Sequence, residues 1–258
     1  MSGTLLAGRR VLVTGAATGI GRATAEYLNE QGASVFGAGL DGDEGRDWVG
    51  RHAGGGPQLL FREADLTVEA EVQAVVAAAV GAFGGLDGVV NCAGIYATGK
   101  RLEDVTDFEW ERTIAVNLTA IFRVCRATLP LLRAAGGGSV VNIASVHALS
   151  TVPGVPAYAT SKAAIVGLSR QMALDYAVDR IRVNSVLVGS VATRMTLDGL
   201  EEAGGAEALG LSFEDNKVAR IAAPREIATA IGFLLSDAAS FVTGSALLAD
   251  GGLTARLL

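Results

Sequence analysis

The 258-residue sequence has little of several residue types that many functional sites need. Two histidines and two cysteines are too few for a histidine-rich metal site or a disulfide framework, so we expect no metal. There is no lysine or arginine run, and 21 basic against 27 acidic residues give a net charge of −6, which disfavours nucleic acid as a partner. No stretch approaches the roughly 20 uninterrupted apolar residues of a membrane helix, so no membrane partner is expected. The first ten residues lack the apolar segment of a signal peptide, which favours a cytoplasmic protein.

Apolar side chains and glycine are what the sequence has in abundance. Half of its residues are apolar and 19% are charged, which suits a large buried core and excludes a disordered chain. The 34 glycines follow no collagen period, so we expect them in turns and close backbone approaches. At this length, and without an evident linker, one domain over residues 1–258 is the expected organisation.

Short apolar runs alternate with longer helical stretches along the chain. Runs that are apolar nearly throughout favour strands covered on both faces, as in a parallel sheet. The alternation predicts an α/β fold: a single doubly wound Rossmann-type domain with a seven-stranded, mainly parallel sheet and helices on both faces. The expected strands are 10–14, 33–38, 59–64, 88–91, 139–144, 182–188 and 245–249. The expected helices are 19–31, 43–53, 67–84, 107–135, 157–177 and 224–236.

One segment, about 190–217, breaks this alternation. It contains several glycines and many acidic residues. A long segment of this kind is typical of a lid over a binding site, and we expect one here. A surface helical insertion without a function is the alternative.

The first expected strand runs into a glycine-rich turn, Thr14–Gly21, and a helix follows. Three glycines at Gly15, Gly19 and Gly21 allow a sharp turn and a close approach to a pyrophosphate. The helix that begins there directs free N–H groups toward such an anion. The position between the first strand and the first helix therefore predicts a dinucleotide site, with a plain tight turn as the alternative.

The second expected strand ends at Gly39-Leu40-Asp41, near the place where an adenosine ribose would lie. An acid at this point holds the ribose 2′-hydroxyl, whereas a base favours a 2′-phosphate. Asp41, with Asp43 nearby, therefore favours NAD over NADP. The alternative is that Asp41 is an ordinary solvated loop acid.

Tyr158 and Lys162 are spaced i, i+4 on an expected helix, which places both side chains on one face. A tyrosine titrates near pH 10, and a nearby cation favours its phenolate, so we expect Lys162 to lower the pKa of Tyr158. Such a tyrosine exchanges a proton with an alcohol or carbonyl oxygen while hydride moves to or from a nicotinamide. Ser145 follows an apolar strand at its carboxyl end, where ligands bind in open α/β sheets.

Taken together, these motifs resemble those of the short-chain dehydrogenases/reductases, a family of nicotinamide-dependent oxidoreductases. The resemblance covers about residues 8–252 and depends on a set of motifs in a fixed order. The set comprises TGAATGIG at 14–21, the acid of Ala64-Asp65-Leu66, NCAG at 91–94, Asn117, Ser145, Tyr158 with Lys162, the run 182–193 and DGG at 250–252.

The resemblance implies a role for each matched residue. Tyr158 is the expected general acid/base, and Lys162 is expected to lower its pKa and bind the nicotinamide ribose. Ser145 is expected to orient the substrate oxygen, and Asn117 to hold a water that continues the proton path. The implied cofactor-binding residues are Gly15, Thr18, Gly19, Ile20, Asp65, Leu66, Asn91, Ala93, Gly94, Tyr158, Lys162, Gly189, Val191 and Thr193.

Some of these residues have a structural alternative. Asp65 is also a candidate cap of the helix expected from 67, and Asn117 a candidate partner for neighbouring backbone. His147 is a candidate for binding a substrate hydroxyl or a loop residue satisfied by its own neighbours. Cys92 stands where family members usually have asparagine, and Val188 where they usually have proline.

The sequence determines the substrate less closely than it determines the fold or the catalytic residues. The favoured function is an NAD-dependent dehydrogenase of a polyol, a sugar or a cyclic alcohol, acting on a small-molecule secondary alcohol or ketone. One alternative is an NADPH-dependent ketoreductase of a 3-oxoacyl or polyketide-like substrate, because Gly39 and Leu40 match neither usual marker of cofactor choice. A second is a non-catalytic nicotinamide-sensing protein. The resemblance also implies a homotetramer or homodimer joined through the helices at 107–135 and 157–177.

Overall fold

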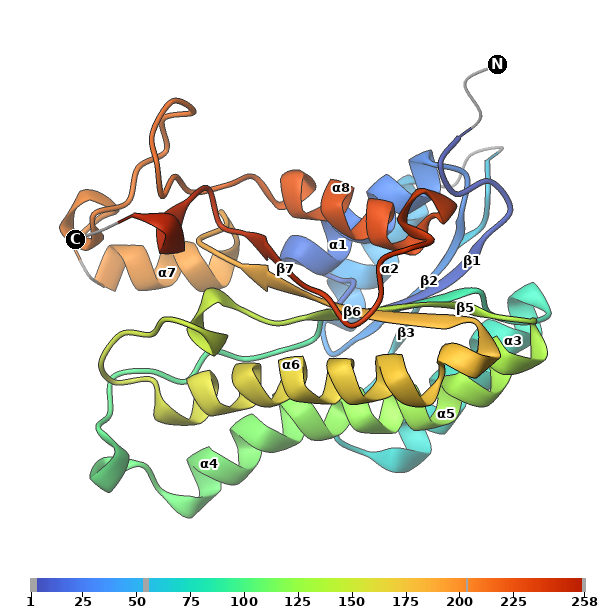
Figure 1. Ribbon diagram of the computed structural model, residues 1–258, viewed down its shortest axis with the longest axis horizontal. Helices are drawn as coiled ribbons and strands as arrows, with labels where there is room; N and C mark the ends of the chain where they lie inside the picture. Colours follow the sequence, from blue (N-terminus) through green and yellow to red (C-terminus); the bar gives the residue numbers. More distant parts are fainter. Residues whose placement is uncertain (1–3, 53–55, 203, 257–258) are drawn as a thin grey trace.

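A sheet of seven strands forms the centre of the computed structural model, which describes residues 4–52, 56–202 and 204–256 (Figure 1). The strand order is β3-β2-β1-β4-β5-β6-β7, and every neighbouring pair is parallel. The expected seven-stranded α/β sheet is therefore confirmed, with no antiparallel pair among these strands. The strands are β1 Arg10–Thr14, β2 Ser34–Gly39, β3 Leu59–Glu63, β4 Gly88–Asn91, β5 Gly138–Ile143, β6 Ile181–Val188 and β7 Ala246–Ala249.

Helices cover both faces of this sheet (Figure 1). The layer above the sheet in the view contains α1 Gly19–Glu30, α2 Gly42–Arg51 and α8 Pro224–Leu235. The layer below it contains α3 Glu69–Phe83, α4 Asp107–Ile114, α5 Ala120–Ala134 and α6 Pro156–Asp175. A further helix, α7 Arg194–Glu202, lies apart from both layers at the left of the view and falls within the expected lid. Single 3₁₀ turns lie at Leu102–Asp104, Val146–Ala148, Ala177–Asp179, Glu207–Leu209, Asp237–Ala239 and Leu253–Ala255.

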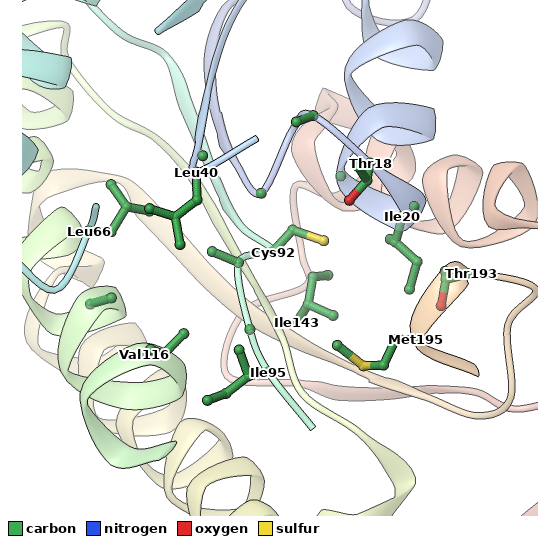
Figure 2. Close-up of a pocket in the computed structure, with 18 of the residues that line it drawn as sticks. Thr18, Ile20, Leu40, Leu66, Cys92, Ile95, Val116, Ile143, Thr193 and Met195 are labelled. Carbon is green, nitrogen blue, oxygen red and sulfur yellow. The ribbon is translucent and has the colours of Figure 1, made fainter. Parts of the chain in front are cut away.

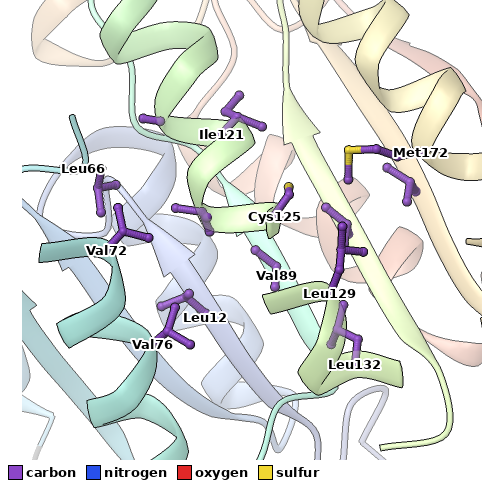
Figure 3. Close-up of a cluster of buried hydrophobic side chains, with 14 of the residues drawn as sticks. Leu12, Leu66, Val72, Val76, Val89, Ile121, Cys125, Leu129, Leu132 and Met172 are labelled. Atoms are coloured by element: carbon purple, nitrogen blue, oxygen red, sulfur yellow. The ribbon is translucent and has the colours of Figure 1, made fainter. Parts of the chain in front are cut away.

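The core consists of two apolar layers because alternate residues of a strand point to opposite faces. Leu12 of β1 packs toward α3 and α5, whereas its neighbours Val11 and Val13 pack toward α1 and α8. Figure 3 shows the first of these layers, where side chains of α3 and α5 meet those of β1 and β4. Both layers fix the sheet, and with it the carboxyl ends of the strands.

The strand order reverses between β1 and β4, the two strands at the centre of the sheet. The helices that follow these strands cover opposite faces, so a crevice opens at the carboxyl ends of the strands between them. This crevice is where the candidate site lies.

The helix expected at 107–135 is continuous but not uniform. A π-helical turn, Ala115–Thr119, separates α4 from α5 and contains the fully buried Asn117. Turns of this kind are rare and often lie at functional sites. Among the described residues, the run Asp107–Ala134 is long and apolar enough to cross a membrane by length and composition. Core helices of soluble proteins pass the same test, and α5 packs on the sheet through Ile121, Val124 and Leu129.

Most expected helix ends differ from the structure by one or two residues. The helix expected from 67 begins at Glu69, because the Asp65 carboxylate binds the backbone and hydroxyl of Thr67 in a turn before the helix. The helix expected to end at 53 ends at Arg51, and residues 53–55 lie outside the described part of the chain.

Candidate active site

A cavity of about 400 Å³ lies in the crevice at the carboxyl ends of the strands. Segments that directly follow β1 to β6 line it together with the start of α7. Figure 2 shows side chains from these segments around one space, with Leu40 and Leu66 toward one end and Thr193 and Met195 toward the other. Of the predicted cofactor residues, all except Asn91 line this cavity.

The glycine-rich turn forms one wall of the cavity. Gly15 has a φ of +66°, and a Cβ at this position would lie 2.9 Å from the backbone N and Cα of Ala93. A Cβ on Gly21 would overlap the Gly15 carbonyl oxygen. Side chains at these glycines would therefore disrupt the turn and its close contact with the loop after β4.

The first turn of α1 opens onto the same space. Thr18 precedes the helix in an extended conformation, and its side chain makes no capping hydrogen bond. No acidic residue lies in the first turn. The free N–H groups and the positive end of the helix dipole therefore suit a diphosphate, so the residues present fit a dinucleotide.

The loop after β4 is held against this turn by Thr14. The buried Thr14 hydroxyl accepts hydrogen bonds from the backbone N–H of Cys92 at 3.0 Å and of Ala93 at 3.2 Å. The two walls of the cavity are thereby fixed relative to each other.

The segment after β2 presents one acidic residue, Asp41, to the cavity. Leu40 and Asp41 line it, and both are exposed. The nearby Arg46 donates to Asp43 at 2.7 Å and to Glu63 at 3.2 Å, so its charge is shared between two carboxylates. Asp41 is therefore the charged side chain that this segment places at this end of the cavity, within the part of the chain that the structure describes.

Asp65 lines the cavity, but its carboxylate is used in the turn before α3. Asp65 Oδ1 accepts from the Thr67 backbone N–H at 2.8 Å and from the Thr67 hydroxyl at 2.7 Å. This carboxylate therefore has a structural partner in the turn, and the residue also lies on the wall of the cavity. Leu66, almost fully buried, provides an apolar surface beside it.

Ser145, Tyr158 and Lys162 come together at the cavity, Ser145 from the end of β5 and the other two from α6. Lys162 Nζ lies 5.5 Å from the centroid of the Tyr158 ring and donates to the Ile143 carbonyl at 3.0 Å. Ser145 Oγ donates to the Val188 carbonyl at 3.4 Å, and Ser145 is also hydrogen-bonded to Tyr158. The expected grouping of a hydroxyl, a phenol and an ammonium is present.

The pKa values of this group differ from the expectation. Burial raises the pKa of Tyr158 to about 12, against a smaller lowering by the hydrogen bond to Ser145. Burial also lowers the pKa of Lys162 to about 8. The net shift of Tyr158 is therefore opposite to the lowering that was expected, because the low-dielectric surroundings disfavour the charged form of both groups.

Asn117 lies behind the cavity rather than on its surface. Its Oδ1 accepts from the Ile95 N–H at 2.8 Å, and its Nδ2 donates to the Ile95 carbonyl at 3.0 Å and to Ser161 Oγ at 3.1 Å. The side chain therefore satisfies neighbouring backbone, which was the alternative for this residue. A Cβ on Gly94 would lie 3.3 Å from Asn117 Oδ1 and 3.5 Å from Lys162 Nζ, so Gly94 lies beside both.

Asn91, which was expected to border a cofactor, lies behind the wall of the cavity rather than on it. Asn91 is buried inside the sheet, and its Nδ2 donates to Asn142 Oδ1 at 2.8 Å and to Cys125 Sγ at 3.3 Å. Its side chain points to the face of the sheet that α5 covers, and the next residue, Cys92, lines the cavity.

The start of the expected lid closes the far side of the cavity. Val191 pairs with Ala222 in an isolated parallel bridge, and the Gly189 N–H donates to the Ala249 carbonyl at 3.0 Å. The Thr193 methyl lies 3.2 Å from where a Gly19 Cβ would be. Gly189, Val191 and Thr193 therefore lie opposite the glycine-rich turn.

Tyr96 is the residue near this site that the sequence analysis did not single out. Its ring packs against Tyr158, with the ring centroids 4.7 Å apart. Its position in the sequence, two residues beyond the NCAG motif in the loop after β4, could have indicated that it lies near the site. Within residues 4–52, 56–202 and 204–256, no group of three His, Cys, Asp or Glu side chains could hold a metal ion.

A family model described as "Enoyl-(Acyl carrier protein) reductase" matches residues 15–254. The chain belongs to the short-chain dehydrogenase/reductase family. This short-chain dehydrogenase/reductase is 40% identical over 251 residues to 2,5-dichloro-2,5-cyclohexadiene-1,4-diol dehydrogenase of Sphingobium indicum, covering 97% of this chain and 98% of the relative. It is 41% identical over 250 residues to trans-4-hydroxycyclohexanecarboxylate dehydrogenase of Sinomonas cyclohexanicum, covering 95% and 92%.

A solved structure of a related reductase has the same fold as this chain. The crystal structure of levodione reductase superposes on this short-chain dehydrogenase/reductase with a TM-score of 0.91 at 31% identity, covering 98% of this chain and 100% of that one. The two named relatives are dehydrogenases of ring alcohols. Together with the family, they support an oxidoreductase that acts on CH–OH groups.

Proposed function

We propose that this protein is a nicotinamide-dependent dehydrogenase that oxidises a secondary hydroxyl group on a carbon ring. The observation that carries the proposal is the meeting of Ser145, Tyr158 and Lys162 at a cavity whose other walls suit a dinucleotide. A hydroxyl, a phenol and an ammonium in one place are the groups needed to bind an alcohol oxygen and remove its proton.

The chemistry divides between the cofactor and the chain. NAD supplies the acceptor for the hydride that leaves the alcohol carbon. Ser145 Oγ binds the alcohol oxygen, and Tyr158 Oη takes its proton, so the alcohol becomes a ketone. Lys162, with a pKa of about 8, is mostly protonated at pH 7, and its charge opposes the burial that disfavours the Tyr158 phenolate.

The other predicted residues have proposed roles in binding. Asn117 fixes the loop that carries Ile95 and lies beside Gly94, and through Ser161 it also contacts α6. The cofactor pyrophosphate is assigned to the turn at Gly15, Thr18, Gly19 and Ile20, and the nicotinamide to the side of Gly189, Val191 and Thr193. Asp65 and Leu66 are assigned to the adenine, to which Leu66 would offer its apolar surface.

The substrate class comes from the relatives and from the site. Both named relatives act on six-membered ring alcohols. Tyr96 and His147 pack their rings against Tyr158, which suits a compact apolar substrate. A ring alcohol is therefore favoured over a sugar or an open-chain polyol.

We further propose that NAD is the preferred cofactor. Asp41 lines the cavity where β2 ends, and the neighbouring Arg46 is occupied by Asp43 and Glu63. The 2′-phosphate of NADP would meet excess negative charge there.

The proposal extends to the whole chain. Residues 1–258 form one domain, with the lid at about 190–217. The protein acts in the cytoplasm, where its two free cysteines stay reduced.

Copies of the chain associate as a dimer or tetramer through α4, α5 and α6. On these helices Phe108, Phe122 and Leu174 are 70%, 45% and 75% exposed. Light scattering of the intact chain would then give two or four times its mass.

A substrate panel tests the proposed function. The protein is incubated with NAD or NADP and with cyclohexanol, 4-hydroxycyclohexanecarboxylate, a sugar and an open-chain polyol, and reduced cofactor is followed by absorbance. We expect NAD-dependent turnover that is fastest with the ring alcohols. Turnover confined to a parallel incubation of NADPH with a 3-oxoacyl substrate would support a ketoreductase, and cofactor binding without any turnover would support a nicotinamide sensor.

A further inference from the structure

Two aromatic rings enclose the phenol of Tyr158. The Tyr96 ring is perpendicular to it at 90°, with centroids 4.7 Å apart, and the His147 ring meets it at 80° and 5.5 Å. Tyr96 and His147 are also 6.1 Å from each other. Edge-to-face contact is a preferred geometry for aromatic pairs, so these three rings support one another.

The rings come from three separate parts of the chain. Tyr96 lies in the loop after β4, His147 in the 3₁₀ turn after β5, and Tyr158 on α6. Ser145 and Tyr158 line the cofactor cavity, whereas Tyr96 and His147 do not. The two flanking rings therefore contact Tyr158 from outside the cavity, on the side left for a substrate.

Tyr96 and His147 differ in how they are held. His147 Nδ1 is hydrogen-bonded to Thr151 Oγ1 at 2.9 Å, so its ring is fixed by a second contact. Tyr96 is 36% exposed and makes the closer approach to Tyr158. Its ring therefore covers one side of Tyr158 that solvent would otherwise reach.

We propose that Tyr96 is a positioning residue for Tyr158, whose ring fixes the direction of the phenol and keeps water from its open side. This inference depends on the proposed acid–base role of Tyr158. A proton acceptor must lie within hydrogen-bond reach of the substrate hydroxyl, and a displacement of about 1 Å is enough to slow a reaction roughly 100-fold.

The pH dependence of the reaction reports on the same contact. The groups that face Tyr158 are Lys162 on its own helix, Ser145 after β5, and the rings of His147 and Tyr96. Burial, with a smaller contribution from the Tyr96 phenol, raises the pKa of Tyr158 to about 12. Removing the Tyr96 ring admits water, which lowers this pKa. Alcohol oxidation needs the phenolate, so the rising limb of rate against pH then moves to lower pH.

The test compares Tyr96→Leu with Tyr96→Phe. Tyr96→Leu removes the ring, and we expect kcat for a ring alcohol to fall between about 10-fold and 100-fold with NADH affinity unchanged. The rising limb of its rate against pH should move to lower pH by about one unit. Tyr96→Phe keeps the ring, so its kcat should stay within about threefold of that of the unmodified protein. The rising limb of its rate against pH should move less than half as far as in Tyr96→Leu.

A measurement without substrate accompanies the kinetics. The ultraviolet absorbance of tyrosinate is followed with pH, and each protein is compared with its own Tyr158→Phe derivative, so that the difference isolates Tyr158 among the four tyrosines. Titration of Tyr158 at lower pH in Tyr96→Leu than in Tyr96→Phe is the expected result. His147→Phe keeps the second ring but removes its titration, so the limb that persists in that variant belongs to Tyr158.

Two results would overturn the inference. One is a Tyr96→Leu protein with unchanged kcat and an unchanged pH limb. The other is a loss of kcat without any movement of the limb or of the Tyr158 titration, which would indicate a merely structural contact. Turnover that survives in Tyr158→Phe would instead contradict the proposed function itself.

Discussion

At the scale of single residues, Asp41 gives the test of cofactor choice. We expect Asp41→Ala to weaken NADH binding and to strengthen NADPH binding, each by roughly tenfold, because one negative charge leaves the ribose end of the cavity. Fluorescence titration with each reduced cofactor measures both affinities. Asp47→Ala removes the same charge from an exposed position further along α2 and should change neither affinity more than about twofold. Equal effects of the two variants would show that Asp41 is only a solvated loop acid.

The sequence predicted which residues gather but not where every side chain points. Ser145, Tyr158 and Lys162 meet because the ends of strands converge and because i, i+4 residues share a helix face. Asp65 and Asn117 are engaged by hydrogen-bond partners, Thr67 and Ile95, whose positions depend on turns that the sequence does not specify. The aromatic pairing of Tyr96 also depends on tertiary packing, so a motif search did not identify it.

At the scale of elements, the turn between β1 and α1 is the most sensitive part of the site. We expect Gly15→Ala to weaken NADH binding at least tenfold and to destabilise the fold by about 1–3 kcal/mol, because its φ of +66° is left-handed and its Cβ would press on Ala93. Gly81→Ala is the matched control, since this exposed glycine of α3 has no atom within 4 Å of its Cβ position. It should stabilise α3 by about 0.5–1 kcal/mol and leave binding unchanged. Normal NADH affinity in Gly15→Ala would contradict the assignment of this turn.

The sequence predicted the type and order of the helices and strands better than their first and last residues. The alternation of apolar runs and helical stretches was sufficient to predict the strands of the sheet, because a strand buried on both faces has a distinct composition. The π-helical turn at Ala115–Thr119 was not predicted, since it changes hydrogen-bond spacing without changing the apolar pattern. The start of α3 differs because Asp65 and Thr67 bind each other.

At the scale of the whole molecule, an ion pair joins the two central strands at the end opposite the site. The Arg10 side chain donates to both oxygens of Asp87, at 2.8 and 2.7 Å, and the Arg10 backbone N–H donates at 2.9 Å. Burial would raise the pKa of Asp87, but these hydrogen bonds and the Arg10 charge leave it below its ordinary value. Because the folded-state pKa is lowered, this carboxylate stabilises the fold above its unfolded pKa, and that stability is lost as pH falls through the folded value.

Asp87→Asn should therefore lower the free energy of unfolding by about 1–3 kcal/mol at pH 7, and by less as the solution is acidified. Urea unfolding at several pH values measures the difference. Asp237→Asn is the control, because its partner Arg9 lies at the surface and the Asp237 side chain is 90% exposed, so this change should cost less than about 1 kcal/mol. An Asp87→Asn effect that does not change with pH would contradict this account of the pair.

The central claim is that Tyr158 exchanges the proton of a ring alcohol while NAD accepts its hydride. Tyr158→Phe tests it most directly, because it removes one oxygen from the site and leaves the walls that hold the cofactor. The account predicts that oxidation of 4-hydroxycyclohexanecarboxylate by NAD falls at least about 100-fold in this variant, with NADH affinity unchanged in a fluorescence titration. Turnover close to that of the unmodified protein would contradict the account.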